Sequence, residues 1–173
     1  MLRSLGIVAL AVAALMAVTL RHTPDRPYAS PDVAVTVTAA RDAAPFPVPA
    51  ATTLPHAWYA NYANFDAVGA GGWWYHVGYV GPADAVVGID ATNESGGSDA
   101  MPSPTGARLR SETAAGLTFD VYADATLAGH EVWVAKGSGT DGRPWVLELA
   151  GDRASIAVIA PALATKGAIA IGS

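Results

Sequence analysis

The chain has 173 residues, of which 51 % are apolar and 14 % are charged, and this length accommodates one compact domain with a short additional segment. Residues 31–173 include 7 basic and 14 acidic residues, so their formal charge is −7 with neutral histidines. Such a domain repels phosphate backbones, and we predict no nucleic-acid partner. The absence of cysteine excludes disulfides, thiolate metal ligands, a cysteine nucleophile and thiol-linked lipids.

An apolar run opens the chain. Leu5 to Leu20 is a stretch of sixteen residues without a charge, and it lies between Arg3 and Arg21. At 1.5 Å per residue it forms roughly 24 Å of helix, and the two arginines can extend it by snorkelling to the membrane interfaces. The alternative is a cleaved signal peptide, but no Ala-x-Ala sequence ends the run. We favour a retained membrane anchor.

The anchor divides the chain into three parts. A charged start followed by an apolar run has the form of an export signal, whereas the charge bias across the run is weak. We therefore expect a single-pass protein of the cell membrane with its domain on the extracytoplasmic side. The predicted parts are a membrane anchor (1–22), a Pro-rich stalk (23–31) and a domain (32–173).

The start of the domain fits two structures. Ser30-Pro31 is typical of a helix start, and Pro45 would end that helix. Against this, valine recurs at every second position over 33–37, as in a strand. We predict a short extended start followed by one helix that ends near Ala44. The prolines in 45–49 then require extended backbone.

Alternating patterns predict strands from Trp58 onward, separated by glycine- and proline-containing turns. Leu117, Phe119 and Val121 point to one face of their strand while the residues between them point to the other. Short turns favour antiparallel pairing, and residues 155–164 suit a final helix across the sheet. The predicted fold class is α+β, a mainly antiparallel sheet with one helix before it and one after it. The strands are expected at about 57–65, 73–80, 85–92, 108–114, 117–123, 130–136 and 143–150.

A series of short motifs resembles a known family. In chain order they are Pro45-Phe46-Pro47-Val48, Leu54-Pro55-x-x-Trp58, Trp74-x-His76-Val77-Gly78-Tyr79, Gly88-Ile89-Asp90 and Pro104-Thr105-Gly106. Behind one N-terminal apolar segment, this series resembles the DUF4245 family, a group of mostly actinobacterial, membrane-anchored proteins. The resemblance implies location and layout, and it carries over no catalytic residue. The chain departs from the family pattern at Ala57, where glycine is usual.

Aromatic residues are concentrated in one part of the chain. Nine of the fourteen lie between Phe46 and Tyr79, where exposed rings could stack on sugars or hold an apolar ligand and buried rings would fill the core. Trp73 and Trp74 point to opposite faces of one strand. We expect Trp74 to be buried and Trp58 to fill the core between sheet and helix. The candidate ligand or interaction surface consists of Trp73, Trp74, Tyr75 and His76.

His76 lies in the middle of a predicted strand, where an imidazole could act as a base or a ligand. Its neighbours in sequence include no nucleophile, and the histidine spacings do not indicate zinc. Asp90, Glu94 and Asp99 lack the alternating ligands of a calcium loop, and we expect solvated loop charges. We therefore predict no catalytic residue, no metal ligand and no cofactor.

The composition and motifs together favour a binding or interaction module of the cell envelope over an enzyme. Its partner would be an envelope protein or an apolar or sugar ligand, besides the membrane itself. The alternative is an envelope hydrolase with a site built around His76. A cleft that joins His76 to Asp90 or Asp120 would favour the enzyme, and a smooth surface with one apolar groove would favour the module.

Overall fold

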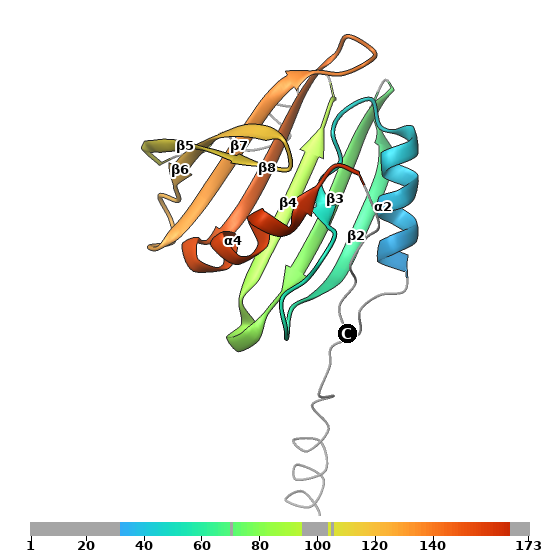
Figure 1. Cartoon of the computed structure of the whole chain (residues 1–173). Helices are drawn as coiled ribbons and strands as arrows, with labels where there is room; N and C mark the ends of the chain where they lie inside the picture. Colours follow the sequence, from blue (N-terminus) through green and yellow to red (C-terminus); the bar gives the residue numbers. More distant parts are fainter. Residues whose placement is uncertain (1–31, 70, 95–103, 105, 167–173) are drawn as a thin grey trace, which may run out of the picture.

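The computed structural model describes residues 32–69, 71–94, 104 and 106–166, and the predicted anchor and stalk lie outside them. Seven strands of the described chain form one antiparallel sheet in the order β2-β3-β4-β8-β7-β6-β5 (Figure 1). No helix in the described ranges is long and apolar enough to cross a membrane. The strands are β2 (Tyr59–Val68), β3 (Gly72–Val80), β4 (Val86–Thr92), β5 (Arg108–Ala114), β6 (Leu117–Ala123), β7 (His130–Ser138) and β8 (Pro144–Asp152).

The sheet is built from two meanders that meet in its centre. Strands β2, β3 and β4 follow one another from one edge, and β5 to β8 run inward from the other edge until β8 pairs with β4. Every pairing is antiparallel, and each predicted strand corresponds to an observed one whose ends agree within three residues. The α+β prediction is therefore confirmed for the sheet and its two helices.

Helix α2 (Asp32–Ala43) begins earlier than predicted. Val33 and Val37 are buried while Val35 is 69 % exposed, because residues four apart share a helix face and residues two apart do not. The predicted extended start was therefore wrong: the alternating valines are one buried stripe with one exposed member. The predicted end near Ala44 is confirmed, and the Arg41 side chain there donates to the carbonyl of Val48 at 3.2 Å.

Helix α4 (Arg153–Ile159) starts directly after β8. Asp152 caps it by accepting a hydrogen bond from the Ser155 backbone N–H at 3.0 Å, which satisfies a donor that the first turn leaves without a helical partner. The predicted helix over 155–164 is thus shorter than expected. A 3-10 turn, η2 (Ala160–Ala162), and a two-residue strand, β9 (Leu163–Ala164), replace its second half, and β9 pairs with β1 (Ala50–Ala51). Another 3-10 turn, η1 (Pro82–Asp84), connects β3 to β4.

Both helices cover the same face of the sheet, which we call the core face. Helix α2 packs on β2 and β3, and α4 packs on β4 and β8 (Figure 1). Their buried side chains form one cluster with the buried side chains of the strands. The opposite face, called the outer face below, carries the alternate residues of each strand.

Candidate ligand-binding groove

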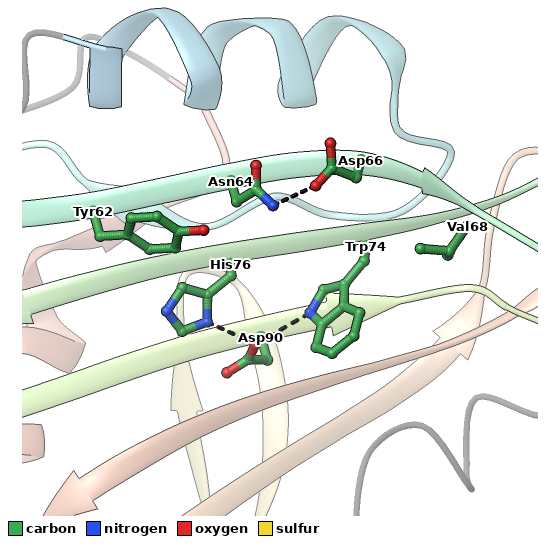
Figure 2. A pocket seen from close by; sticks show the side chains of 7 residues that line it. All are labelled: Tyr62, Asn64, Asp66, Val68, Trp74, His76 and Asp90. Carbon is green, nitrogen blue, oxygen red and sulfur yellow. Dashed lines mark hydrogen bonds and ion pairs between the residues drawn. The ribbon is translucent and has the colours of Figure 1, made fainter.

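A hollow of about 360 Å³ lies on the outer face of β2, β3 and β4. We call it the groove. Figure 2 shows its side chains standing on three neighbouring strands, with β3 in the middle. The residues that line it are Tyr62, Asn64, Asp66, Val68, Trp74, His76 and Asp90.

The strand register explains why these residues meet. Asn64 on β2 lies opposite His76 on β3, which in turn lies opposite Asp90 on β4, and antiparallel partners point to the same face. The next row along the strands contains Gly78 opposite Gly88. These two positions carry no side chain, and neighbouring side chains take the space: Asn61 Oδ1 lies 2.7 Å from where a Cβ on Gly78 would be, and the His76 ring lies beside Gly88.

Asp90 is the centre of a polar network in the groove. Its Oδ1 atom lies 2.7 Å from His76 Nδ1 and accepts a hydrogen bond from Trp74 Nε1 at 3.2 Å (Figure 2). One carboxylate oxygen on β4 therefore bonds to two rings that stand on β3. When Nδ1 carries the proton of the imidazole, it donates to Asp90, and Nε2 becomes the acceptor nitrogen.

Two exposed rings flank this network. Tyr62 is 50 % exposed and Trp74 is 41 % exposed, whereas aromatic rings of this size are usually well buried. The Tyr62 ring lies 5.4 Å from the His76 ring, centroid to centroid, with the planes tilted by 52°. On the β2 side, Asn64 donates to Asp66. The groove thus combines accessible ring surface with two carboxylates.

A third carboxylate lies next to the groove. Glu148 on β8 is opposite Asp90 on β4, and the two side chains therefore share the outer face. Burial, and then the charges of Asp90 and Asp124, raise the pKa of Glu148 to about 7 from its ordinary 4.5. A carboxyl with this pKa is partly protonated near neutral pH, because further negative charge is unfavourable there.

Comparison with known proteins gives one match. The family model described as a protein of unknown function, DUF4245, matches residues 1–164. The chain belongs to the DUF4245 family. No curated protein and no solved structure matches it, so the DUF4245 match brings no reaction or ligand with it.

The groove of this DUF4245 chain contains two of the four predicted surface residues. Trp74 and His76 line it. Tyr75 is fully buried on the core face, and Trp73 is half-buried and stacks on Phe65 with ring centroids 4.7 Å apart. The structure therefore splits the predicted run between the two faces of β3.

The expected burial of Trp74 was wrong. Tyr75, Val77 and Tyr79 fill the core under the helices, so the alternate residues of β3, Trp74 among them, face outward. The space beside Gly78 is occupied by the Asn61 side chain and not by a buried Trp74. Trp58 is buried as expected, at 7 % exposure, and its ring lies against Gly81, where an added Cβ would meet ring atoms at 2.4 Å.

Several groove residues were not predicted from the sequence. Tyr62, Asn64 and Asp66 alternate along β2, and that spacing was the signal that they share a face. Asp90 was expected to be a solvated loop charge and was also considered as a partner of His76. It lies within β4 and bonds to both His76 and Trp74. Asp99 lies outside the described residues. Glu148 is far from the groove in sequence, and only the β4–β8 pairing brings it close.

A second hollow, of about 410 Å³, lies on the core face between β5, β7 and α4. The Glu131 side chain beside it is 5 % exposed and accepts from both terminal nitrogens of Arg110, at 2.9 and 2.8 Å, and from Trp133 Nε1 at 2.9 Å. These bonds lower the pKa of Glu131, the Arg110 bonds most. Because all of these bonds are made, we assign the cluster of Arg110, Glu131 and Trp133 a structural role in joining β5 to β7.

Metal-binding chemistry has little basis in this part of the chain. The described residues contain no group of three or more histidine, aspartate or glutamate side chains arranged to hold an ion. His76 and Asp90 make a pair and Asp66 bonds to Asn64. The groove can donate and accept hydrogen bonds and present ring faces, which is the chemistry of a ligand site.

Proposed function

We propose that this DUF4245 protein is a ligand-binding module held at the extracytoplasmic side of the cell membrane by its N-terminal segment, and that the groove is its binding site. The observation that supports this most is the exposure of the Tyr62 and Trp74 rings in one groove, with Trp74 held by its bond to Asp90. Exposed rings that are fixed in place by hydrogen bonds bind a partner at little cost in conformational entropy.

The location part of the proposal rests on the apolar run over 5–20, bracketed by arginines. A reporter enzyme that matures only outside the cytoplasm, fused after Ser173, should be active, because one span has no second span to return the chain. A reporter that works only in the cytoplasm would overturn this location.

Photocrosslinking in cells tests the groove. A photoreactive phenylalanine analogue replaces Tyr62 in the full-length protein, and the same analogue at Val35, an exposed residue of α2, serves as the matched control. We expect an adduct at position 62 that is absent at position 35, detected by mass spectrometry of the purified chain. Identical products at both positions would contradict a specific site in the groove.

The groove joins His76 to Asp90, which is the arrangement expected of an enzyme. This pair favours a second candidate, an envelope hydrolase in which His76 Nε2 takes a proton from water while Asp90 orients the ring. Two observations place it second. The described residues that line the groove include no serine, cysteine or lysine. Strands β3 and β4 are interior strands whose backbone N–H groups pair on both sides, so an oxyanion would depend on side-chain donors such as Asn64.

A substrate screen distinguishes the two candidates. Wild-type protein is compared with His76→Gln on panels of ester, amide and glycoside substrates. Turnover that His76→Gln abolishes would replace the binding proposal with the hydrolase. The binding module predicts equal background rates for both proteins, together with loss of the position-62 adduct in the Trp74→Ala variant.

A further inference from the structure

The electrostatics of the groove indicate which class of ligand it suits. Asp66 and Asp90 are among its lining residues, and no arginine or lysine is among the described ones. On the same face but outside the groove, the Asp120 carboxylate is paired with Arg108 at 2.7 Å. In the groove, by contrast, Asp66 accepts from the neutral amide of Asn64, and Asp90 bonds to the indole of Trp74 and the imidazole of His76, so neither carboxylate is paired with a permanently charged side chain.

Ring faces accompany these carboxylates. Tyr62 and Trp74 are about half exposed at the mouth of the hollow, and the negative face of an aromatic ring attracts cations, most strongly for tryptophan. A carboxylate and a ring face act in the same direction, and both favour a positively charged group. Neither gains as much from a neutral hydroxyl.

From this juxtaposition of Tyr62 and Trp74 with Asp66 and Asp90, we infer that the groove binds an organic cation of the ammonium type. This inference rests on the proposed function and adds the ligand class to it. The cation lies against the indole and phenol rings and within reach of the carboxylates, which its charge complements. The hollow of about 360 Å³ falls at the small end of ligand sites, about 300–1,000 Å³, so a small head group fits better than an oligomer.

The neighbourhood of Glu148 supports a cation from a separate observation. Burial, and after it the negative charges of Asp90 and Asp124, raise the pKa of Glu148 to about 7, so this side chain retains a proton toward neutral pH. A bound cation beside Asp90 would offset that charge. The formal charge of −7 over residues 31–173 also draws cations toward the domain at low ionic strength.

The test is an NMR titration of the full-length protein in a polyoxyethylene detergent, which carries neither an ammonium nor a sugar head group. The probe is choline chloride, and the matched neutral control is 3,3-dimethylbutan-1-ol, which has the same shape with carbon in place of nitrogen. The readout is the indole N–H signal of Trp74, assigned with Trp74→Phe. The indole of Trp133, bonded to buried Glu131, is the internal control.

We expect choline to shift the Trp74 signal and leave the Trp133 signal unchanged, and the neutral isostere to bind at least about tenfold more weakly, because the charge contributes at least about 1.4 kcal/mol. Asp66→Asn should weaken choline binding about tenfold and leave isostere binding unchanged. Asp42→Asn, on the exposed end of α2, should change neither.

Two further probes, glycerophosphocholine and neutral oligosaccharides, test where the cation comes from and whether the ligand is a cation at all. Glycerophosphocholine carries the same ammonium group on a phosphodiester, so comparing it with choline distinguishes a lipid head group from a free ammonium compound. Binding of either supports the inference. Equal binding of choline and the isostere, or a Trp74 shift caused only by neutral oligosaccharides, would overturn the cation and leave the binding module standing. If no probe shifts Trp74 and position 62 gives no specific adduct, both proposals fail.

Discussion

The two faces of β3 consist of alternating residues of one strand, but one face is buried in the core and the other is exposed. Tyr75, Val77 and Tyr79 point to the core face and are fully buried, while Trp74 on the outer face is 41 % exposed. Both faces are rich in aromatic and aliphatic side chains. What distinguishes them is the covering layer, since α2 packs on one face and the groove opens on the other.

Hydrogen bonding differs between the faces as well. On the core face, Tyr75 donates to the carbonyl of Pro49 at 3.1 Å, and the Ala51 N–H donates to the Tyr79 hydroxyl at 2.8 Å. These two bonds connect β3 to β1 and to Pro49 just before it. On the outer face, Trp74 and His76 bond to Asp90 on the adjacent strand. The bonds of the core face therefore connect β3 to a segment distant in sequence. Those of the outer face fix the side chains of adjacent strands relative to one another.

The largest expected effect comes from the buried residue next to this sheet, Trp58. Truncation by Trp58→Ala should lower the free energy of unfolding by about 3–5 kcal/mol, because the ring is buried against Gly81 and its removal leaves a cavity. Urea unfolding followed by circular dichroism measures it. Wild-type stability in this variant would show that the aromatic segment does not build the core.

A smaller effect is expected from the crowded carboxylates of the outer face. Because the pKa of Glu148 is raised to about 7 in the folded protein, the unfolded chain releases this proton first, and stability should fall as pH rises from about 4.5 to 7. Glu148→Gln removes the penalty and should be more stable than wild type at pH 8 by about 2 kcal/mol. The two should converge near pH 4, as followed by urea unfolding.

The matched control for this pH dependence is Asp42→Asn, which removes an exposed carboxylate from α2. It should leave the fall in stability between pH 4.5 and 7 in place. If the stability of Glu148→Gln falls with pH as that of wild type does, the pKa of Glu148 is not raised in the folded protein.

A third change tests one hydroxyl of the core face. Tyr79→Phe leaves the ring in place and removes the acceptor of the buried Ala51 N–H, so it should cost about 1 kcal/mol of unfolding free energy. Burial raises the pKa of Tyr79 to about 12, and the hydroxyl is therefore neutral at working pH. Tyr62→Phe, on the exposed face, should change stability by less than half as much in the same urea titration.

Sequence reasoning succeeded where a local pattern decides the structure. The alternation of Leu117, Phe119 and Val121 predicted β6. Glycine-containing separators predicted turns between the strands, and between β2 and β3 Gly69 and Gly71 have φ of +54° and +83°. Helix α2 was misjudged because its valines fit both periods, and only packing shows that Val35 is exposed.

The groove depends on information that a local pattern does not contain. Trp74 was assigned to the wrong face because both faces of β3 are apolar, and the face that α2 covers is set by tertiary packing. Asp90 meets His76 through the β3–β4 register, and Glu148 meets Asp90 through a pairing between strands 58 residues apart in sequence. The alternation of Tyr62, Asn64 and Asp66 was the one local signal available.

The most direct test of this account compares two adjacent substitutions on β3 by urea unfolding under one set of conditions. Tyr75→Ala should lower the free energy of unfolding by about 3–5 kcal/mol, since the ring is fully buried. Trp74→Ala should lower it by less than about 1 kcal/mol, because the indole is exposed and its bond to Asp90 is solvated. If Trp74→Ala costs as much as Tyr75→Ala, the indole belongs to the core, and the outer face is not a surface kept open for a ligand.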